Sequence, residues 1–464
     1  MSGGRLPVDA SPQWVARGCV LLLVLVLVAP TAVSAVGGGA TSLQAGTVSE
    51  PANGTTVISV QGFKIAGQQS SKKPARLVGV GPRGEVEWVY DGANDGIVWF
   101  YDVDPLANGS LLITGTRPGE TVVTVWNPKT GETAWSETFD WEDTHDVDLI
   151  NGDQLLVGNM RNYNETAERN DDQILLYDRS EEAVVWRWRF RDHGFDRSNG
   201  GRYSGDWTHV NDVDKVAEGE YLVSPRNFDQ VFVINRTTGD ISRRLGSDEE
   251  HDVLYEQHNP QYLRGEGGTP TMLVADSEND RVVEYARTNG SWTRTWTLTG
   301  NFNWPRDADR LPNGNTLVTD TLNHRVMEVT PDGEVVWEFY APWGPYDAER
   351  IKLGDEPGGP TIREQNATGA ATLTNSASLT PGSAGVTPAR LLTETFANTP
   401  LSAQAAWLGE RWAHVTPWIR PVWMGPWQFV QTLAAGLVLV GWAGAEAFHR
   451  RRRLREQVAA AIGD

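Results

Sequence analysis

The sequence predicts an all-β fold, a six-bladed β-propeller, with an apolar segment toward each end of the chain. The first observation is a short segment that recurs five times in the same local frame: residues 100–104 (FYDVD), 144–148 (THDVD), 209–214 (HVNDVD), 257–260 (QHNP) and 305–309 (PRDAD). Each copy is followed by a Gly-containing turn and an apolar strand, as at residues 107–113 and 312–318. Periods of about 40 to 50 residues with short apolar strands are typical of radial repeats, in which no sheet can bury its faces alone.

A second pair of strands completes each repeat around a turn and a Trp-containing strand. It is clearest at residues 331–337 (PDGEVVW), 82–88 (PRGEVEW) and 129–135 (KTGETAW). Four short strands make one blade. We expect the propeller to span residues 37–350. The strand at residues 55–60 leaves the blade count open by one, because it either starts the first blade or closes the last.

The charge balance excludes one class of partner. The 464 residues include 60 Asp and Glu against 40 Lys and Arg, a formal net charge of −20. Such a chain repels phosphate backbones, so nucleic acid is not expected to bind. Acid-rich surfaces stay hydrated at high salt, which indicates a halophilic source, with an ordinary acidic secreted protein as the alternative. Cys19 is the single cysteine, so no disulfide can form within the chain.

Both ends of the chain carry membrane signals. Residues 19–30 are rich in Leu and Val and precede small residues that end at Ala35, so residues 1–36 are expected to be a cleaved signal peptide or a retained anchor. Residues 427–448 form an apolar span followed by four arginines at 450–453. By the positive-inside rule, residues 449–464 are a cytoplasmic tail and the propeller is extracellular.

The region between propeller and span has its own composition. Residues 351–405 are rich in Gly, Ser, Thr, Ala and Pro and are expected to be a flexible stalk. Residues 406–426 carry irregularly spaced Trp and Pro, which favours a segment at the lipid interface. Glycosylation sequons, consistent with an external glycoprotein, stand at Asn53, Asn108, Asn164, Asn235, Asn289 and Asn366.

The recurring segments also contain the candidate functional side chains. The first strand of each blade lines the central channel, so corresponding residues converge on one mouth. Imidazole and guanidinium groups there suit an anion when protonated, because they donate charge-assisted hydrogen bonds. Three neutral histidines binding zinc is the competing interpretation. The residues expected at the mouth are Tyr101, His145, His209, His258 and Arg306.

A structural interpretation applies to part of the same segments. Polar residues at strand starts commonly bond backbone groups of the next blade. The repeated Asp-x-Asp is expected to be such a tie, and His145 fits a tie as well as a site. The polar insertion at residues 191–205 either covers the channel mouth or decorates the surface.

Two motifs make the sequence resemble a known family. Residues 206–211 (DWTHVN) and 221–226 (YLVSPR) resemble the Asp-Trp-x-His-x-Asn and Ser-x-Arg stretches of the propeller-type arylsulfate sulfotransferases, or arylsulfotransferases. Residues 257–258 and 273–281 resemble that family's next blade, and residues 315–324 fall where its last active-site histidine stands. The resemblance covers roughly residues 75–345.

The resemblance implies a ping-pong transfer, in which an aromatic sulfate donor gives its sulfuryl group to a histidine and then to a phenolic acceptor. By position, His324 is the nucleophile, and His209, His258 and Arg281 stabilise the sulfuryl oxygens. The remaining substrate-binding residues are expected to be His145, Arg306, Arg226 and Tyr101. No metal or diffusible cofactor is required.

Two alternatives stay open. Residues 320–326 (DTLNHRV) and 276–282 (DSENDRV) also resemble the repeat turn of NHL propellers, which would make His324 and Arg281 parts of a framework. The rival function is a non-catalytic extracellular binding module that displays a ligand or protein surface. A lyase or hydrolase that uses a channel metal is a third interpretation.

Overall fold

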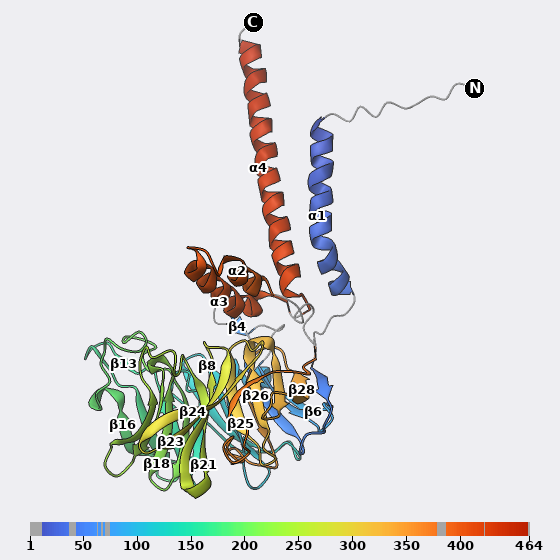
Figure 1. Cartoon of the computed structure of the whole chain (residues 1–464). Helices are drawn as coiled ribbons and strands as arrows, with labels where there is room; N and C mark the ends of the chain where they lie inside the picture. The colour runs from blue at the N-terminus through green and yellow to red at the C-terminus, as the bar shows by residue number, and fades with distance from the viewer. Residues whose placement is uncertain are drawn as a thin grey trace. The chain divides into compact units, whose positions relative to one another are not determined.

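The computed structural model describes residues 12–36, 43–62, 64–65, 68–69, 75–377, 387–421 and 423–462. The chain divides into two compact units (Figure 1). One unit is Ser42–Ala377, and the other combines the two ends of the chain, Met1–Thr41 and Ser378–Asp464.

The unit Ser42–Ala377 is a six-bladed β-propeller, as predicted. The first three blades are consecutive in sequence. Blade one is β7 (Trp99–Pro105), β8 (Leu111–Arg117), β9 (Glu120–Trp126) and β10 (Thr133–Phe139). Blade two is β11 (Val147–Ile150), β12 (Gln154–Asn159), β15 (Gln173–Asp178) and β16 (Ala183–Arg189). Blade three is β17 (Val210–Ala217), β18 (Glu220–Pro225), β19 (Gln230–Asn235) and β20 (Ile241–Gly246).

The other three blades recruit strands from distant segments. Blade four is β21 (His258–Gly265), β22 (Thr269–Asp276), β23 (Arg281–Thr288), β24 (Ser291–Thr299) and β30 (Gly369–Thr372). Blade five is β25 (Pro305–Arg310), β26 (Thr316–Asp320), β27 (Arg325–Val329), β28 (Val335–Tyr340) and β1 (Gln44–Val48). Blade six is β29 (Pro345–Arg350), β2 (Thr56–Val60), β5 (Arg76–Val80) and β6 (Val86–Asp91). Two-stranded ribbons are β3 (Lys64–Ile65) with β4 (Gln68–Gln69), and β13 (Tyr163–Asn164) with β14 (Arg169–Asn170).

The propeller closes through two pairings between its ends. β29 is the first strand of blade six and pairs with β2, while β1 pairs with the outer strand β28 of blade five. The strand at residues 55–60 is therefore β2, the second strand of blade six, which settles the blade count. All residues of β28 are buried because β1 covers its outer edge, whereas the uncovered β10 keeps exposed positions.

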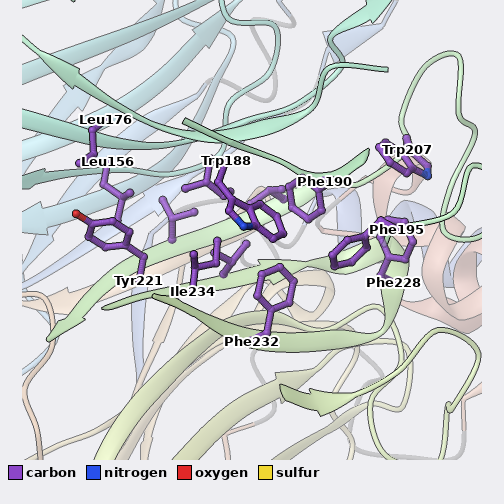
Figure 2. Packing of buried hydrophobic residues seen from close by; sticks show 14 of the residues in the cluster. Leu156, Leu176, Trp188, Phe190, Phe195, Trp207, Tyr221, Phe228, Phe232 and Ile234 are labelled. Atoms are coloured by element: carbon purple, nitrogen blue, oxygen red, sulfur yellow. The ribbon is translucent and has the colours of Figure 1, made fainter. Parts of the chain in front are cut away.

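An aromatic core joins blades two and three and holds the insertion at residues 191–205 (Figure 2). Phe195 from the insertion packs edge-on against Phe190 and Phe228, with ring centroids 5.0 and 4.9 Å apart. Trp207 at its end is fully buried. Burying large aromatic rings contributes about 2 to 3 kcal/mol each. The insertion is thus fixed to the propeller at its middle and at its end.

The propeller unit extends beyond the expected boundary at residue 350. Ile362 is fully buried in the core of blades four and five. β30 adds a parallel fifth strand to β24. Residues 351–377 therefore pack as part of the propeller rather than as a stalk, while residues 378–386 of the expected stalk lie outside the described residues, as do residues 37–42 at the expected start.

The second unit is helical. Its helices are α1 (Pro12–Val36), α2 (Pro388–Phe396), α3 (Ser402–Ile419) and α4 (Pro426–Ile462). Within the described residues, α1 and α4 are long and apolar enough to span a membrane. The two helices contact each other, and Arg17 pairs with Glu446 at 2.8 Å. The expected span is the first part of α4, the expected tail continues that helix, and most of the expected interfacial segment is helix α3.

Candidate functional site

Six side chains, one from the inner edge of each blade, meet on the propeller axis. Ring centroids of Tyr101 and His145 are 3.8 Å apart in a stacked arrangement. His145 and His209 follow at 4.8 Å, edge to face. All six are at least nine-tenths buried. We call this set the axial ring: Tyr101, His145, His209, His258, Arg306 and Tyr346.

Tyr346 joins the two halves of the axial ring. Its ring centroid lies 5.6 Å from that of His145 and 6.0 Å from that of His258. The Arg306 guanidinium lies 4.9 Å from the same ring, a distance that allows a cation–π contact. The site is therefore continuous around the axis.

β-bulges explain how these residues come to face the axis. A regular strand points successive side chains to opposite faces, but a bulge inserts one residue and re-aims its neighbours. The register shifts at the start of the first strand in blades one, three, four and five, and the pairing of β29 with β2 shifts at the corresponding place. Consecutive residues such as Tyr101 and Asp102 are thereby freed from strict alternation.

The structure brings together all five residues expected at the mouth. Tyr346 was not among them, because its strand β29 comes from the far end of the chain and closes the ring. The signal was nevertheless present: residues 345–349 (PYDAE) repeat the pattern of an aromatic residue followed by two acids separated by one residue, as at 101–104.

Asp206 and His209 form a hydrogen-bonded pair at the edge of the axial ring. The imidazole Nδ1 lies 2.7 Å from the carboxylate Oδ2. A carboxylate only accepts, so Nδ1 carries the proton and Nε2 keeps its lone pair. His209 has a left-handed φ of 46°, a strained conformation for a residue other than glycine or asparagine. Strain of this kind persists where the surroundings fix it, here through Asp206.

The rest of the segment 206–211 supports that pair. Thr208 Oγ1 donates to Asp172 Oδ2 at 2.8 Å, which fixes the backbone before His209. Asn211 Nδ2 donates to the Gln257 carbonyl at 3.0 Å. Its side-chain oxygen therefore faces His145 Nδ1, 3.1 Å away. His145 lies between two acceptors, because its Nε2 is 3.7 Å from Asp143 Oδ2.

His258 has the same protonation pattern as His209. Its Nδ1 lies 3.0 Å from the Glu256 carbonyl and 2.8 Å from Ser277 Oγ. A carbonyl accepts only, so the lone pair is on Nε2. That nitrogen is buried and has no hydrogen-bond partner among the described residues. A buried, unsatisfied lone pair is uncommon in a stable fold and marks a place for a ligand.

Burial keeps the three imidazoles neutral. Burial, and then the charge of Arg226, lowers the pKa of His209 to about 3. Burial also lowers the pKa of His145, and burial with the nearby charge of Arg306 lowers the pKa of His258 well below its usual range. The expectation of protonated histidines at the mouth is therefore wrong for the unliganded protein: desolvation disfavours the charged form.

The positive charge of the site comes from arginine. Burial lowers the pKa of Arg306 to about 10, which leaves it charged at neutral pH. Arg226 lies between the segments that carry His258 and His209. Its Nε is 3.5 Å from Glu256 Oε2, and its Nη2 is 3.9 Å from Asp206 Oδ2. The site thus combines neutral nitrogen lone pairs with two guanidinium groups.

Arg281 is placed in a turn of blade four. Its Nε donates to Asp276 Oδ2 at 2.6 Å, and its Nη2 donates to the Asp252 carbonyl at 2.9 Å. Blade five repeats this arrangement with Arg325 and Asp320 at 2.8 Å. These contacts stabilise the turn, and a direct role for Arg281 in transfer stays a prediction.

His324 follows the short 3-10 helix Thr321–Asn323 and is also in the left-handed region, with φ 60°. Its Nδ1 accepts a hydrogen bond from the Gly344 backbone N–H at 3.2 Å. Its ring packs edge-on against Trp343, with centroids 4.7 Å apart. The Nδ1 lone pair is therefore already engaged, and the role of His324 as nucleophile stays a prediction.

An open cavity of about 610 Å³ borders this site beside the insertion. Asp206 and Glu256 line it. These residues contact His209 and His258 respectively, through a side chain and a carbonyl. Further lining comes from Arg202, Asn227, Glu249 and Tyr255. The volume is suitable for a small aromatic ligand.

Residues 50–260 match the family model described as Arylsulfotransferase (ASST). The match confirms the resemblance to arylsulfotransferases, over a range that begins and ends earlier than expected. The matched range includes Tyr101, His145, His209 and His258, and ends before Arg306 and Tyr346. No curated protein matches the chain significantly.

Several solved structures are similar at low identity. A protein of unknown function from Bacteroides caccae has a TM-score of 0.41 and 14% identity, over 62% of this chain and 93% of that chain. Virginiamycin B lyase from Staphylococcus aureus has a TM-score of 0.33 and 11% identity, over 54% and 72%. The nidogen/laminin complex has a TM-score of 0.39 and 13% identity, over 60% and 89%.

Proposed function

We propose that this protein transfers a sulfuryl group from an aryl sulfate ester to a phenol at the axial ring. The observation that carries the proposal is the convergence of three neutral imidazoles with Arg306 and Arg226. Neutral imidazole is a competent nucleophile, and fixed guanidinium groups stabilise sulfuryl oxygens in bidentate fashion. The family match over residues 50–260 supports the same reaction class.

His258 is the proposed nucleophile. Its Nδ1 proton is held by the Glu256 carbonyl, so Nε2 is oriented for attack. In the first half-reaction, the Nε2 lone pair forms a bond to sulfur, the bond from sulfur to the aryl oxygen breaks, and the phenolate leaves. Arg306 and Arg226 would hold the sulfuryl oxygens and stabilise the charge that moves toward the leaving oxygen.

His209 is the proposed base for the second half-reaction. Its Nε2 takes the proton of the acceptor phenol, whose oxygen attacks sulfur and releases His258. Asp206 stabilises the imidazolium that forms, because its carboxylate bonds the Nδ1 proton. The cavity beside Asp206 would admit the two phenols in turn. The reaction needs no metal or diffusible cofactor.

The experiment is a transfer assay on the full-length protein in detergent, with 4-nitrophenyl sulfate as donor and a second phenol as acceptor. We expect nitrophenolate release that requires the acceptor, with parallel-line kinetics of a double displacement. His258→Ala and His209→Ala should each lose about 1,000-fold in kcat/KM. His193→Ala, which removes an exposed imidazole that lines neither the axial ring nor the cavity, is the matched control.

His324→Ala decides between the two candidate nucleophiles. Loss of transfer in His324→Ala with an unchanged melting temperature, and survival of transfer in His258→Ala, would assign the nucleophile to His324 instead. Folded protein without turnover on several donors, but with measurable sulfate binding lost in Arg306→Met, would replace the enzyme by the binding module.

We also propose that α4 spans the cell membrane with the propeller outside and the arginines at 450–453 in the cytoplasm. The arginine cluster and the apolar length of α4 support this orientation. Protease added to intact cells should remove the propeller and spare an epitope placed after residue 462. Loss of that epitope with the propeller retained would reverse the orientation.

A further inference from the structure

A layer of carboxylates lies further along the same inner strands, past the axial ring. Each inner strand except that of blade four contributes an acid at corresponding positions, and Asp355 follows from the segment after β29. We call this set the lower carboxylate layer: Asp104, Asp148, Asp214, Asp309, Glu349 and Asp355. Other acids, including Asp146, Asp307 and Asp347, lie between this layer and the axial ring. Together with every member of the layer except Asp104, they line a second, small cavity, distinct from the one beside the insertion.

Some of these acids are ties between blades, as the sequence predicted. Asp146 Oδ2 accepts from the Val213 backbone N–H at 2.5 Å, and Asp347 Oδ2 accepts from the Val103 N–H at 2.9 Å. Each of these bonds uses a single carboxylate oxygen. A structural role as a tie between blades therefore accounts for only one of the two carboxylate oxygens of Asp146 and of Asp347.

Asp214 and Asp309 make no such tie. Their side chains are 8% and 5% exposed, and the Oδ2 atom of each is buried without a hydrogen-bond partner among the described residues. Both line the cavity. Unsatisfied carboxylate oxygens in a buried channel are costly unless a cation neutralises them.

The surroundings offer no protein cation in compensation. None of the described residues that line this cavity is Lys, Arg or His. Its volume is about 20 Å³, enough for one water-sized species. Donor oxygens of Asp104, Asp148 and Asp355 all lie within 4.8 Å of one another, as the ligands of one ion do.

We propose that the lower carboxylate layer binds one Ca²⁺ ion on the propeller axis. An all-oxygen donor set selects a hard cation, and Ca²⁺ tolerates six to eight oxygens at about 2.3 to 2.6 Å in irregular geometry. Protein zinc sites usually include nitrogen or sulfur ligands, which this layer lacks. The ion would link acids from different blades and remove the mutual repulsion of their charges. This site is separate from the proposed transfer chemistry and does not depend on it.

The test uses the full-length protein in detergent, stripped with EGTA and dialysed against Ca²⁺ at constant ionic strength. We expect one Ca²⁺ per chain by elemental analysis. The melting temperature should rise by about 5 °C at saturating Ca²⁺, because the ion binds the folded state alone. An equal ionic strength of K⁺ should leave it unchanged.

Asp214→Asn with Asp309→Asn is the decisive variant, because neither residue bonds a backbone group of another blade. Calcium affinity should fall at least 10-fold. Without Ca²⁺, this variant should melt no lower than the stripped wild type, because neither carboxylate accepts a backbone hydrogen bond from another blade; a merely structural role predicts a lower melting temperature. Asp332→Asn, which removes one acid from an exposed turn, is the matched control and should bind Ca²⁺ like the wild type.

Three results would overturn the proposal. The first is wild-type protein that retains no Ca²⁺ and melts alike with Ca²⁺ and K⁺. The second is equal Ca²⁺ affinity in the double variant and Asp332→Asn. The third is a response to Mg²⁺ without one to Ca²⁺, which would overturn the assignment of the ion.

Discussion

The axial ring and the lower carboxylate layer come from the same inner strands, a few residues apart, yet they differ in how their polar atoms are satisfied. In the axial ring, each imidazole Nδ1 is bonded, and the free groups are nitrogen lone pairs beside guanidinium charge. In the carboxylate layer, the free groups are oxygen lone pairs beside further acids. The strands therefore present an anion site and a cation site along one axis, each recognised by what its own residues leave unpaired.

The largest effect should follow from removing the charge of the axial ring. Arg306→Met keeps much of the side-chain volume and removes the guanidinium that lies over Tyr346. We expect kcat/KM for the aryl sulfate to fall about 1,000-fold, the upper range for one stabilising donor. Steady-state kinetics with a melting curve check it. Activity per folded molecule that equals the wild type would remove Arg306 from the site.

Asp206→Asn tests how the His209 imidazole is oriented. The amide can donate as well as accept, so the Nδ1 proton is no longer fixed and the base is weakened. We expect kcat to fall about 30-fold with KM nearly unchanged. Stopped-flow measurement of each half-reaction should place the loss in transfer to the acceptor. An equal loss in the first half-reaction would contradict the role given to His209.

Tie acids and free acids should differ in stability. Asp146→Ala leaves the buried Val213 N–H without its acceptor, which costs about 2 kcal/mol. Asp309→Ala breaks no backbone bond and should cost much less in Ca²⁺-free protein, apart from its small cavity. Chemical unfolding of both variants after EGTA treatment checks the difference. Equal destabilisation would remove the distinction between the two kinds of acid.

The pH dependence of stability should carry the signature of buried, neutral His209. Its pKa is about 3 when folded and near 6.5 when unfolded, so between these values the unfolded chain binds the extra proton. The stability of the wild type relative to His209→Gln should therefore rise by about 3 kcal/mol from about pH 4 to about pH 7, and level off above. A difference independent of pH would mean that His209 titrates normally in the folded state.

The smallest effect should couple the two sites. Calcium bound in the carboxylate layer offsets negative charge that otherwise opposes an aryl sulfate in the axial ring. Removing Ca²⁺ should raise KM about threefold while kcat stays within error. Asp214→Asn with Asp309→Asn should have a lower KM than the wild type only when Ca²⁺ is absent. A KM that does not respond to Ca²⁺ would show the sites to be independent.

The repeat made five residues of the axial ring predictable, because radial symmetry carries corresponding residues to one axis. Tyr346 was not predicted, because strand β29 is separated from its partner β2 by most of the chain. Only the closed propeller aligns these two strands. The neutral state of His258 was equally hidden. It depends on complete burial and on the nearby charge of Arg306, neither of which a sequence pattern specifies.

The C-terminal boundary of the propeller, expected at residue 350, could not be predicted for a related reason. Residues 351–377 lack a sustained apolar period, yet a single residue, Ile362, fills the core of blades four and five, and its N–H is bonded by the buried Glu284. One anchor and one short parallel strand hold this segment, which is too little for a periodicity argument to detect. The repeated turn around Arg281 was visible in the sequence, but its ion pair with Asp276 came only with the structure.

The most direct measurement is intact-mass analysis of protein quenched during turnover with 4-nitrophenyl sulfate and no acceptor, followed by peptide mapping. The account predicts a mass increase of one sulfuryl group per chain, located on His258, absent in His258→Ala, and discharged when phenol is added. A sulfuryl group located on His324 would contradict it. So would protein that binds sulfate but shows neither a burst of nitrophenolate nor the added mass of a sulfuryl group.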